Sequence, residues 1–264
     1  IATAAWVVVF LSALLVSPAS ADSVARYAGA GATSGGAGTG WTTPAGSLGA
    51  DDTNYATVNL GVGGTSEYLL ATNFGFSIPT NATIEGIQVA ILRQSSSSGG
   101  NNSIDDQDLY LRKGGANVGN DHAVTTDWPT SMQIATYGAT DDLWGTTWTP
   151  AEVNANNFGV ALSVLNESGS SNRTASVDYI QVTITYTAPT PPAITSATSA
   201  TFTVGITNTF TVTATGSPAP TFSVTAGSLP SGVTLSSAGI LSGRPAAGTV
   251  GTYPITITAG NGQL

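Results

Sequence analysis

Residues 179–187 read YIQVTITYT, and this alternation of large apolar and polar residues is typical of a β-strand. Every second position is apolar: Ile180, Val182, Ile184 and Tyr186. Glutamine and threonine fill the positions between them. Because successive side chains of a strand point to opposite faces, this pattern predicts a sheet with one buried face and one solvated face, as in antiparallel sheets.

The same period of two recurs throughout residues 56–187. It appears in four further segments: FGFSIP (74–79), IEGIQVAILR (84–93), LYL (109–111) and FGVALSVLN (158–166). Turns rich in Gly, Pro, Asn and Ser separate them, which predicts an all-β fold, a β-sandwich of jelly-roll type. One helical turn is expected in WTPAEVN (148–154), where Thr149 and Glu152 form a capping box around Pro150.

A proline-rich spacer, residues 188–192 within TAPTPPA, predicts a boundary between a sandwich at 22–187 and a second module at 193–264. The composition changes across it. All fifteen acidic residues and five of the six basic residues precede the spacer, and Arg244 is the single charged residue after it.

The second module carries a resemblance in three segments: TVTATGSPAPTFSV (211–224), LPSGVTLSSAGILSGRPAAG (229–248) and GTYPITITAGNG (251–262). They resemble the immunoglobulin-like domain of the cadherin-like superfamily, which occurs in tandem in bacterial haemagglutinin-like surface proteins. The resemblance implies a β-sandwich spacer without catalytic residues.

Periodicity supports the same fold independently, since four apolar pairs predict four strands: Phe202 with Val204, Phe210 with Val212, Phe222 with Val224, and Ile255 with Ile257. Asn261-Gly262 is a hairpin signal with only two residues after it. The module is therefore expected to be truncated at its C-terminal end, with an unpaired sheet edge.

Residues 23–187 look similar to uncharacterised β-sandwich modules of large secreted bacterial proteins and some phage structural proteins. The segments that carry this resemblance are FGFSIPTNATIEGIQVAI, DDLWGTTWTPAEVNANNFGVAL and VDYIQVTITYT. It implies an extracellular or structural setting and no mechanism.

The N-terminal segment, residues 1–21, combines an apolar run at 4–16 with Pro18 and the triplet Ala19-Ser20-Ala21. This is the pattern of a secretory signal peptide whose charged first part is missing, and cleavage would leave Asp22 as the first residue. A transmembrane anchor is the alternative. We therefore predict a secreted or cell-surface protein that has no membrane segment once the signal peptide is cleaved.

Composition excludes several classes of function. A net charge of −9 with a single lysine disfavours nucleic acid as a partner, because phosphate backbones repel an acidic surface. The absence of cysteine excludes disulfides, thiolate metal sites and a cysteine nucleophile.

Catalysis is not predicted. His122 is the single histidine, and no G-x-S-x-G motif accompanies it, so we interpret it as a loop residue. A glycosidase needs a buried acid of raised pKa. Alternation instead places Asp106 and Asp108 on the solvated face of their strand, opposite Leu109.

Calcium is a better use for clustered acids, since it takes oxygen ligands and often stabilises extracellular modules. The candidate ligands of a structural calcium are Asp105, Asp106, Asp108, Asp141 and Asp142. Ordinary surface charge is the alternative, and no other cofactor is expected.

Aromatic residues in or beside predicted loops are candidates for stacking against a sugar: Trp41, Trp128, Tyr137, Trp144 and Trp148. The alternative is that the rings close the ends of the core, as buried tryptophans commonly do.

The sequence thus predicts a non-catalytic extracellular surface or matrix protein. Adhesion or carbohydrate binding through residues 22–187 is the leading hypothesis, with glycans or surface proteins as partners and the second module as a spacer. Two alternatives stay open: an accessory region of a secreted hydrolase whose catalytic domain lies beyond residue 264, and a purely structural stalk.

Overall fold

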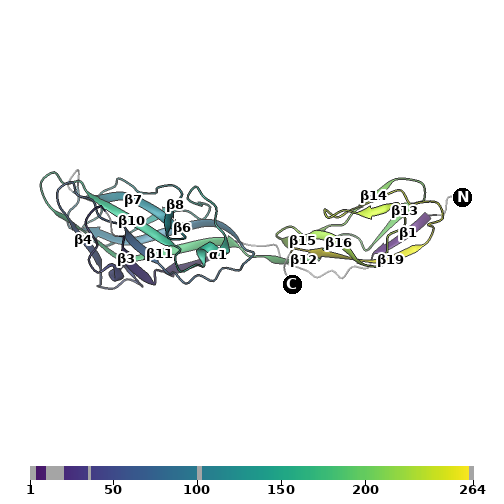
Figure 1. Ribbon diagram of the computed structural model, residues 1–264, viewed down its shortest axis with the longest axis horizontal. Helices are drawn as coiled ribbons and strands as arrows, with labels where there is room; N and C mark the ends of the chain where they lie inside the picture. Colours follow the sequence, from purple (N-terminus) through teal and green to yellow (C-terminus); the bar gives the residue numbers. More distant parts are fainter. Residues whose placement is uncertain (1–3, 10–20, 35–36, 100–102, 262–264) are drawn as a thin grey trace. The chain divides into compact units, whose positions relative to one another are not determined.

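The computed structural model describes residues 4–9, 21–34, 37–99 and 103–261, with side-chain positions from residue 21 onward. The chain divides into two compact units (Figure 1). The sandwich unit comprises Ala21–Thr187. The C-terminal unit comprises Ala188–Leu264 together with the N-terminal strand β1 (Ala4–Val9).

The predicted all-β fold is confirmed in the sandwich unit, which consists of two antiparallel sheets. The first sheet has the order β3-β5-β10-β7-β8, and its strands are β3 (Ala30–Thr33), β5 (Leu69–Thr72), β10 (Gly159–Asn166), β7 (Ile104–Lys113) and β8 (Ala116–Val118). The second has the order β2-β11-β6-β9, and its strands are β2 (Ala21–Tyr27), β11 (Arg173–Thr187), β6 (Thr83–Ser95) and β9 (Gln133–Gly138). Strand β4 (Ala56–Leu60) also pairs with β11.

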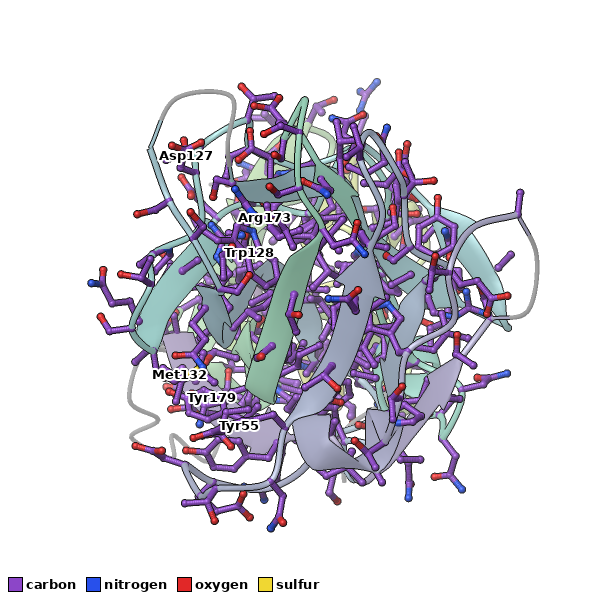
Figure 2. All side chains as sticks on the ribbon, turned by 90° about the vertical axis from the view of Figure 1, so that its left-hand side faces the viewer. Tyr55, Asp127, Trp128, Met132, Arg173 and Tyr179 are labelled. Carbon is purple, nitrogen blue, oxygen red and sulfur yellow. The ribbon has the colours of Figure 1, made fainter. Side chains whose placement is uncertain are left out.

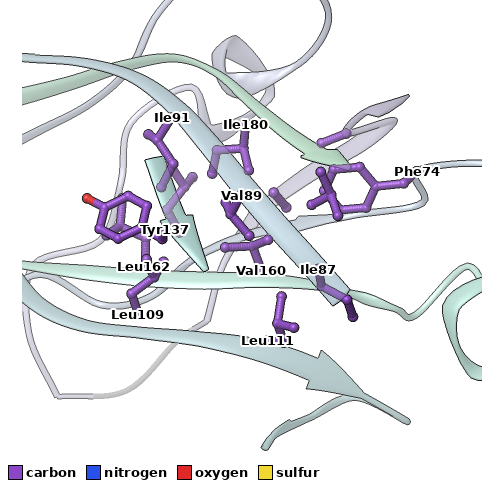
Figure 3. Close-up of a cluster of buried hydrophobic side chains, with 14 of the residues drawn as sticks. Phe74, Ile87, Val89, Ile91, Leu109, Leu111, Tyr137, Val160, Leu162 and Ile180 are labelled. Atoms are coloured by element: carbon purple, nitrogen blue, oxygen red, sulfur yellow. The ribbon is translucent and has the colours of Figure 1, made fainter. Parts of the chain in front are cut away.

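The core lies between these two sheets (Figure 3). Side chains from four strands meet there without exposed surface: Ile87, Val89, Ile91, Leu109, Leu111, Val160, Leu162 and Ile180. Each such side chain contributes about 1.5–3 kcal/mol relative to an exposed one. Strand β11 keeps the predicted alternation from Ile180 to Ile184, since Ile180 and Val182 are fully buried whereas Gln181 is partly exposed. It breaks after Ile184, where the register with β6 shifts and Thr185 is buried while Tyr186 is partly exposed.

Residues 74–79, predicted to be a strand, are irregular, although Phe74, Phe76 and Ile78 are buried as expected. Asn73 and Gly75 adopt positive φ angles of 58° and 65°, which breaks the extended conformation. The Asn154 side chain pairs with the Ile78 backbone in place of a neighbouring strand: its Nδ2 donates to Ile78 O and its Oδ1 accepts from Ile78 N, both at 2.8 Å.

The predicted helical turn is confirmed as α1 (Pro150–Val153). The Glu152 N–H donates to Thr149 Oγ1 at 3.3 Å, and the Thr149 N–H donates to Glu152 Oε2 at 2.8 Å, which completes the capping box. A short 3₁₀ helix, η1 (Pro44–Ser47), lies in the Gly- and Ala-rich tract before β4.

The C-terminal unit contains the four predicted strands as β13 (Ser199–Thr203), β14 (Asn208–Thr211), β16 (Thr221–Ala226) and β19 (Thr252–Gly260). They belong to two sheets, β13-β1-β19-β16 and β14-β18-β17, the latter with β17 (Val233–Leu235) and β18 (Ile240–Gly243). The core residues that they share are Ala200, Phe202, Val212, Val233, Leu241, Ile255 and Ile257.

The proline-rich segment is only partly a free spacer. Residues from Thr190 onward form β12 (Thr190–Ile194), which pairs with β15 (Ala214–Ser217). The register shifts between Thr190 and Ala193, where Pro191 and Pro192 have no N–H to donate.

The sheet edge that we expected to be unpaired has a partner. Strand β1 lies between β13 and β19, antiparallel to the first and parallel to the second. Residues 4–9, expected to belong to a signal peptide, therefore form a strand in the uncleaved chain. The remainder of the apolar run, with Pro18 and Ala19-Ser20, lies outside the described residues, as does the Gly262 half of the hairpin signal.

Candidate functional site

The five aromatic residues predicted to stack against a sugar are buried, with exposed fractions of 0–7%. All four indole N–H groups are bonded within the protein: Trp41 to Glu67 O (2.9 Å), Trp128 to Asp106 Oδ1 (2.9 Å), Trp144 to Ile87 O (2.8 Å) and Trp148 to Leu143 O (3.1 Å). Because no ring presents a free face, the prediction that these residues contact a ligand is corrected: they complete the core.

Asp106, predicted to face solvent, is buried and forms an ion pair with the equally buried Arg93 of the second sheet. It also accepts hydrogen bonds from the Tyr137 hydroxyl at 2.8 Å and from the Val124 N–H at 3.1 Å. Burial and the Asp106 charge raise the pKa of Tyr137. This network satisfies both carboxylate oxygens, so Asp106 bridges the two sheets of the sandwich.

A β-bulge explains why alternation failed here. Ser163 pairs with Asp108 while the next residue of β10, Val164, pairs with Asp106, so Gln107 has no partner in the ladder. One extra residue reverses the side-chain parity from that point. Asp106 therefore shares the core face with Leu109 rather than lying opposite to it.

The other predicted calcium ligands do not converge. Asp108 accepts hydrogen bonds from the Tyr68 hydroxyl and from Ser163, and Asp142 accepts from His122 Nε2 at 2.7 Å and from the Trp144 N–H at 2.7 Å. Asp141 is exposed. Among the described residues, one group of three acidic side chains lies close enough together to hold a metal ion, and Asp105 is the one predicted aspartate that belongs to it.

His122 lies in a loop, as predicted, and is half-buried. Its ring stacks on Trp144 with the centroids 4.0 Å apart, and Nδ1 lies 3.3 Å from Asn120 O. The Asp142 carboxylate fixes the orientation of this imidazole, and the pair holds the 141–144 turn against the loop after β8.

An acidic cluster, defined as Asp105, Asp127 and Glu167, lies at the end of the sandwich that faces the viewer in Figure 2, where Asp127 precedes the buried Trp128. One carboxylate oxygen of each residue lies within 4.8 Å of the others. Asp105 is only 2% exposed, and its Oδ1 has no hydrogen-bond partner among the described residues. Burial, followed by the charges of Glu167 and Asp127, raises the pKa of Asp105 to about 6.

Sequence reasoning missed Asp127 and Glu167 because they are far from Asp105 along the chain. Glu167 directly follows β10, and the antiparallel pairing of β10 with β7 places it near Asp105. No local sequence pattern shows that pairing, and none marks Asp127, which lies in an irregular segment.

A second feature, here called the polar groove, is a cavity of about 550 Å³ over the outer face of the first sheet. Its lining is Ser34, Ala37, Thr65, Ser66, Glu67, Tyr68, Gln107, Asp108 and Ser163. Gln107 and Asp108 lie in β7, Ser163 lies in β10, and the other lining residues lie in the segments that follow β3 and precede β5. Asp108 points outward because its neighbour Leu109 points into the core.

Hydrogen bonds hold the groove in shape. Thr33 Oγ1 donates to Glu67 Oε2 at 2.6 Å, and the Tyr68 hydroxyl donates to Asp108 Oδ2 at 3.0 Å. Ser163 Oγ donates to the same oxygen of Asp108 at 2.8 Å. Burial and the bond to Asp108 raise the pKa of Tyr68 to about 12, so its hydroxyl stays protonated as a donor.

A smaller cavity of about 460 Å³ lies beside η1, lined by Thr43, Ala45, Gly46, Leu48, Asp52, Thr53, Asn54 and Tyr55. Its Asp52 N–H donates to the buried Asp178 carboxylate at 3.2 Å. Burial and a hydrogen bond with Asp51 raise the pKa of Asp178 to about 6.

No helix in the described part of the chain has the length and apolar character that crossing a membrane requires.

Comparison with known proteins identifies the C-terminal segment. Residues 182–263 match a family model described as "Putative Ig domain". One solved structure is similar, the "Cyanophage Pam1 capsid asymmetric unit", with 18% sequence identity over 67% of this chain and 94% of that chain. Its TM-score of 0.27 is too low to support any argument about fold or function. No curated protein matches the chain. The predicted resemblance of the C-terminal segment to an immunoglobulin-like domain is thus confirmed.

Proposed function

We propose that this protein is a non-catalytic extracellular surface protein whose sandwich unit binds carbohydrate in the polar groove, with the immunoglobulin-like unit as a spacer. The observation that carries the proposal is the groove itself, which combines hydroxyls, carboxylates, an amide and one tyrosine ring from β7, β10 and the segments that follow β3 and precede β5. Its volume lies within the usual range of small-molecule sites, about 300–1,000 Å³.

The chemistry of the lining suits a sugar. Carboxylates such as Glu67 accept hydrogen bonds from sugar hydroxyls, and the exposed Gln107 amide both donates and accepts. The partly exposed Tyr68 offers an apolar ring edge beside a polar tip. Tyr68 therefore takes the role that the sequence pattern suggested for the buried tryptophans.

Preorganisation favours binding over a purely structural role. The Glu67 carboxylate is already held by Thr33, and Asp108 is already held by Tyr68 and Ser163. Side chains fixed before binding lose little conformational entropy when the ligand arrives.

Export belongs to the same proposal. The apolar run at 4–16 followed by Ala19-Ser20-Ala21 supports secretion, and a surface location supports adhesion as the biological role. A structural calcium ion is also part of the proposed extracellular module, because such modules often bind calcium for stability.

A glycan array probed with the full chain tests the groove, followed by calorimetry with the best-binding glycan. We expect Tyr68→Ala and Gln107→Ala each to weaken binding by about tenfold or more, since each removes a contact of about 1.4 kcal/mol. Tyr55→Ala, in the smaller cavity, is the matched control and should bind as the wild type does.

Two results would contradict the proposal. Binding to no glycan on a broad array would favour a structural stalk, and glycan binding that is lost in Tyr55→Ala but kept in Tyr68→Ala would move the site to the smaller cavity.

A further inference from the structure

We propose that Asp105, Asp127 and Glu167 form a calcium site at one end of the sandwich unit. This inference goes beyond the proposed carbohydrate binding, and two of the three ligands differ from those suggested by the aspartate-rich segments of the sequence. It rests on the convergence of three carboxylates and on the unpartnered, buried oxygen of Asp105.

Main-chain hydrogen bonds fix the three positions independently of the carboxylates. The Trp128 N–H donates to Ile104 O at 2.9 Å, which places Asp127 next to the start of β7. The Glu167 N–H donates to Ser103 O at 3.1 Å, and Leu165 pairs with Asp105 in the β7-β10 ladder. The backbone thus brings three like charges together and holds them there.

No ion pair among the described residues joins a basic side chain to a member of this cluster. The nearby buried guanidinium of Arg93 is bonded to Asp106. The other ion pairs of the described residues are Lys113–Glu152 and His122–Asp142, and neither includes a member of the cluster. A buried carboxylate without a partner is strongly unfavourable, so a bound cation would relieve both the repulsion and the missing contact of Asp105 Oδ1.

The donor set favours calcium among the common cations. All three side chains offer oxygen, the ligand of hard cations, and the chain lacks cysteine for a soft one. Two oxygens on opposite sides of one Ca²⁺ ion lie about 4.8 Å apart, twice the usual calcium–oxygen distance. The carboxylate oxygens of the cluster lie within 4.8 Å of one another, which is compatible with one ion between them. Magnesium requires shorter contacts of about 2.1 Å in a stricter octahedron.

Bound calcium would tie together three segments that are distant in sequence. They are the start of β7, the end of β10 and the irregular segment that leads into Trp128. Asp127 also accepts a hydrogen bond from the Gly99 N–H at 2.8 Å, so the ion would reach a fourth segment through it. The expected effect is a stiffer end of the sandwich and a higher melting temperature.

The test uses the full chain, freed of divalent ions by a chelator and then titrated with calcium chloride. We expect one binding event by calorimetry. The melting temperature of the sandwich unit should rise by about 5–10 °C when free calcium reaches about 100 times its dissociation constant. Terbium, bound in place of calcium, should emit when tryptophan is excited, and calcium should displace it.

Asp127→Asn and Glu167→Gln keep the size of each side chain and remove one charge. Both variants should fold, and both should lose most of the calcium-dependent rise. Asp141→Asn is the matched control: it removes the same charge from an exposed aspartate outside the cluster and should respond to calcium as the wild type does.

Three results would overturn the site. They are an unchanged melting curve on adding calcium to the wild type, an equal calcium response in Glu167→Gln and the wild type, and equal stabilisation by magnesium at the same concentration. None of them bears on the polar groove, whose glycan binding is measured separately.

Discussion

The indole N–H of Trp41 donates a hydrogen bond to the main-chain oxygen of Glu67 at 2.9 Å. The buried Trp41 ring therefore fixes the backbone of a residue that lines the polar groove. Trp41, which the sequence suggested as a ligand contact, instead holds the backbone of Glu67, a residue of the proposed carbohydrate site. A substitution of Trp41 should therefore affect both glycan binding and the stability of the sandwich unit.

Trp41→Phe should destabilise the sandwich unit by about 1–3 kcal/mol, because the Glu67 carbonyl loses a donor in a part-buried place. Glycan binding should weaken as Glu67 becomes less well positioned. Urea unfolding and calorimetry measure the two effects. Trp148→Phe is the control, since it removes a similar bond, to Leu143 O, away from the groove. Equal glycan affinity in Trp41→Phe and Trp148→Phe would refute the coupling.

Arg93→Met should cost about 3–5 kcal/mol, because it leaves the Asp106 charge buried without its cation. The double variant Arg93→Met with Asp106→Leu should be less destabilised than Arg93→Met alone, since it removes both charges. Urea unfolding of the full chain, followed by tryptophan fluorescence, provides the measurement. Strict additivity of the two substitutions would argue against a direct interaction of the pair.

Stability should fall as the pH rises from about 4 to 6. Burial raises the pKa of Asp105 from 3.8 to about 6, so the folded state binds this proton more tightly than the unfolded state does. Asp105→Asn removes the titrating group. With a chelator present, it should be more stable than the wild type by about 1–3 kcal/mol at pH 7 and nearly equal to it at pH 4.

Urea unfolding at pH 4, 5, 6 and 7 gives this difference directly, and Asp141→Asn serves as the control. A difference between Asp105→Asn and the wild type that is the same at every pH would show that Asp105 does not titrate in this range.

Cleavage after Ala21 should separate β1 from its neighbours. In an export-competent bacterial host we expect mass spectrometry of the secreted protein to give Asp22 as the first residue. The edges of β13 and β19 that β1 covers in the uncleaved chain would then be unpaired. The cleaved chain should melt at a lower temperature in its immunoglobulin-like unit only. Recovery of the intact N-terminus from the medium would disprove cleavage and favour β1 as a permanent strand.

Local sequence patterns predicted the structure correctly where a residue's environment depends mainly on its neighbours in the sequence. The alternation predicted which side chains of β11 are buried from Ile180 to Ile184, although it failed at the buried Thr185 and the partly exposed Tyr186. The capping box at Thr149 and Glu152 is present as expected. The strand expected at 74–79 failed, because the partner of Ile78 is the Asn154 side chain, 76 residues further along the chain.

The sequence by itself determined the fold class and the immunoglobulin-like module, because period-two hydrophobicity and turn residues act over a few positions. Only the tertiary structure decided the sites. A single bulge at Gln107 turned Asp106 into the core. Sheet register then brought Asp105 and Glu167 together, and a loop contact added Asp127. Convergence of this kind depends on which strands pair and in what register, and that is set by packing of the whole core rather than by any one segment.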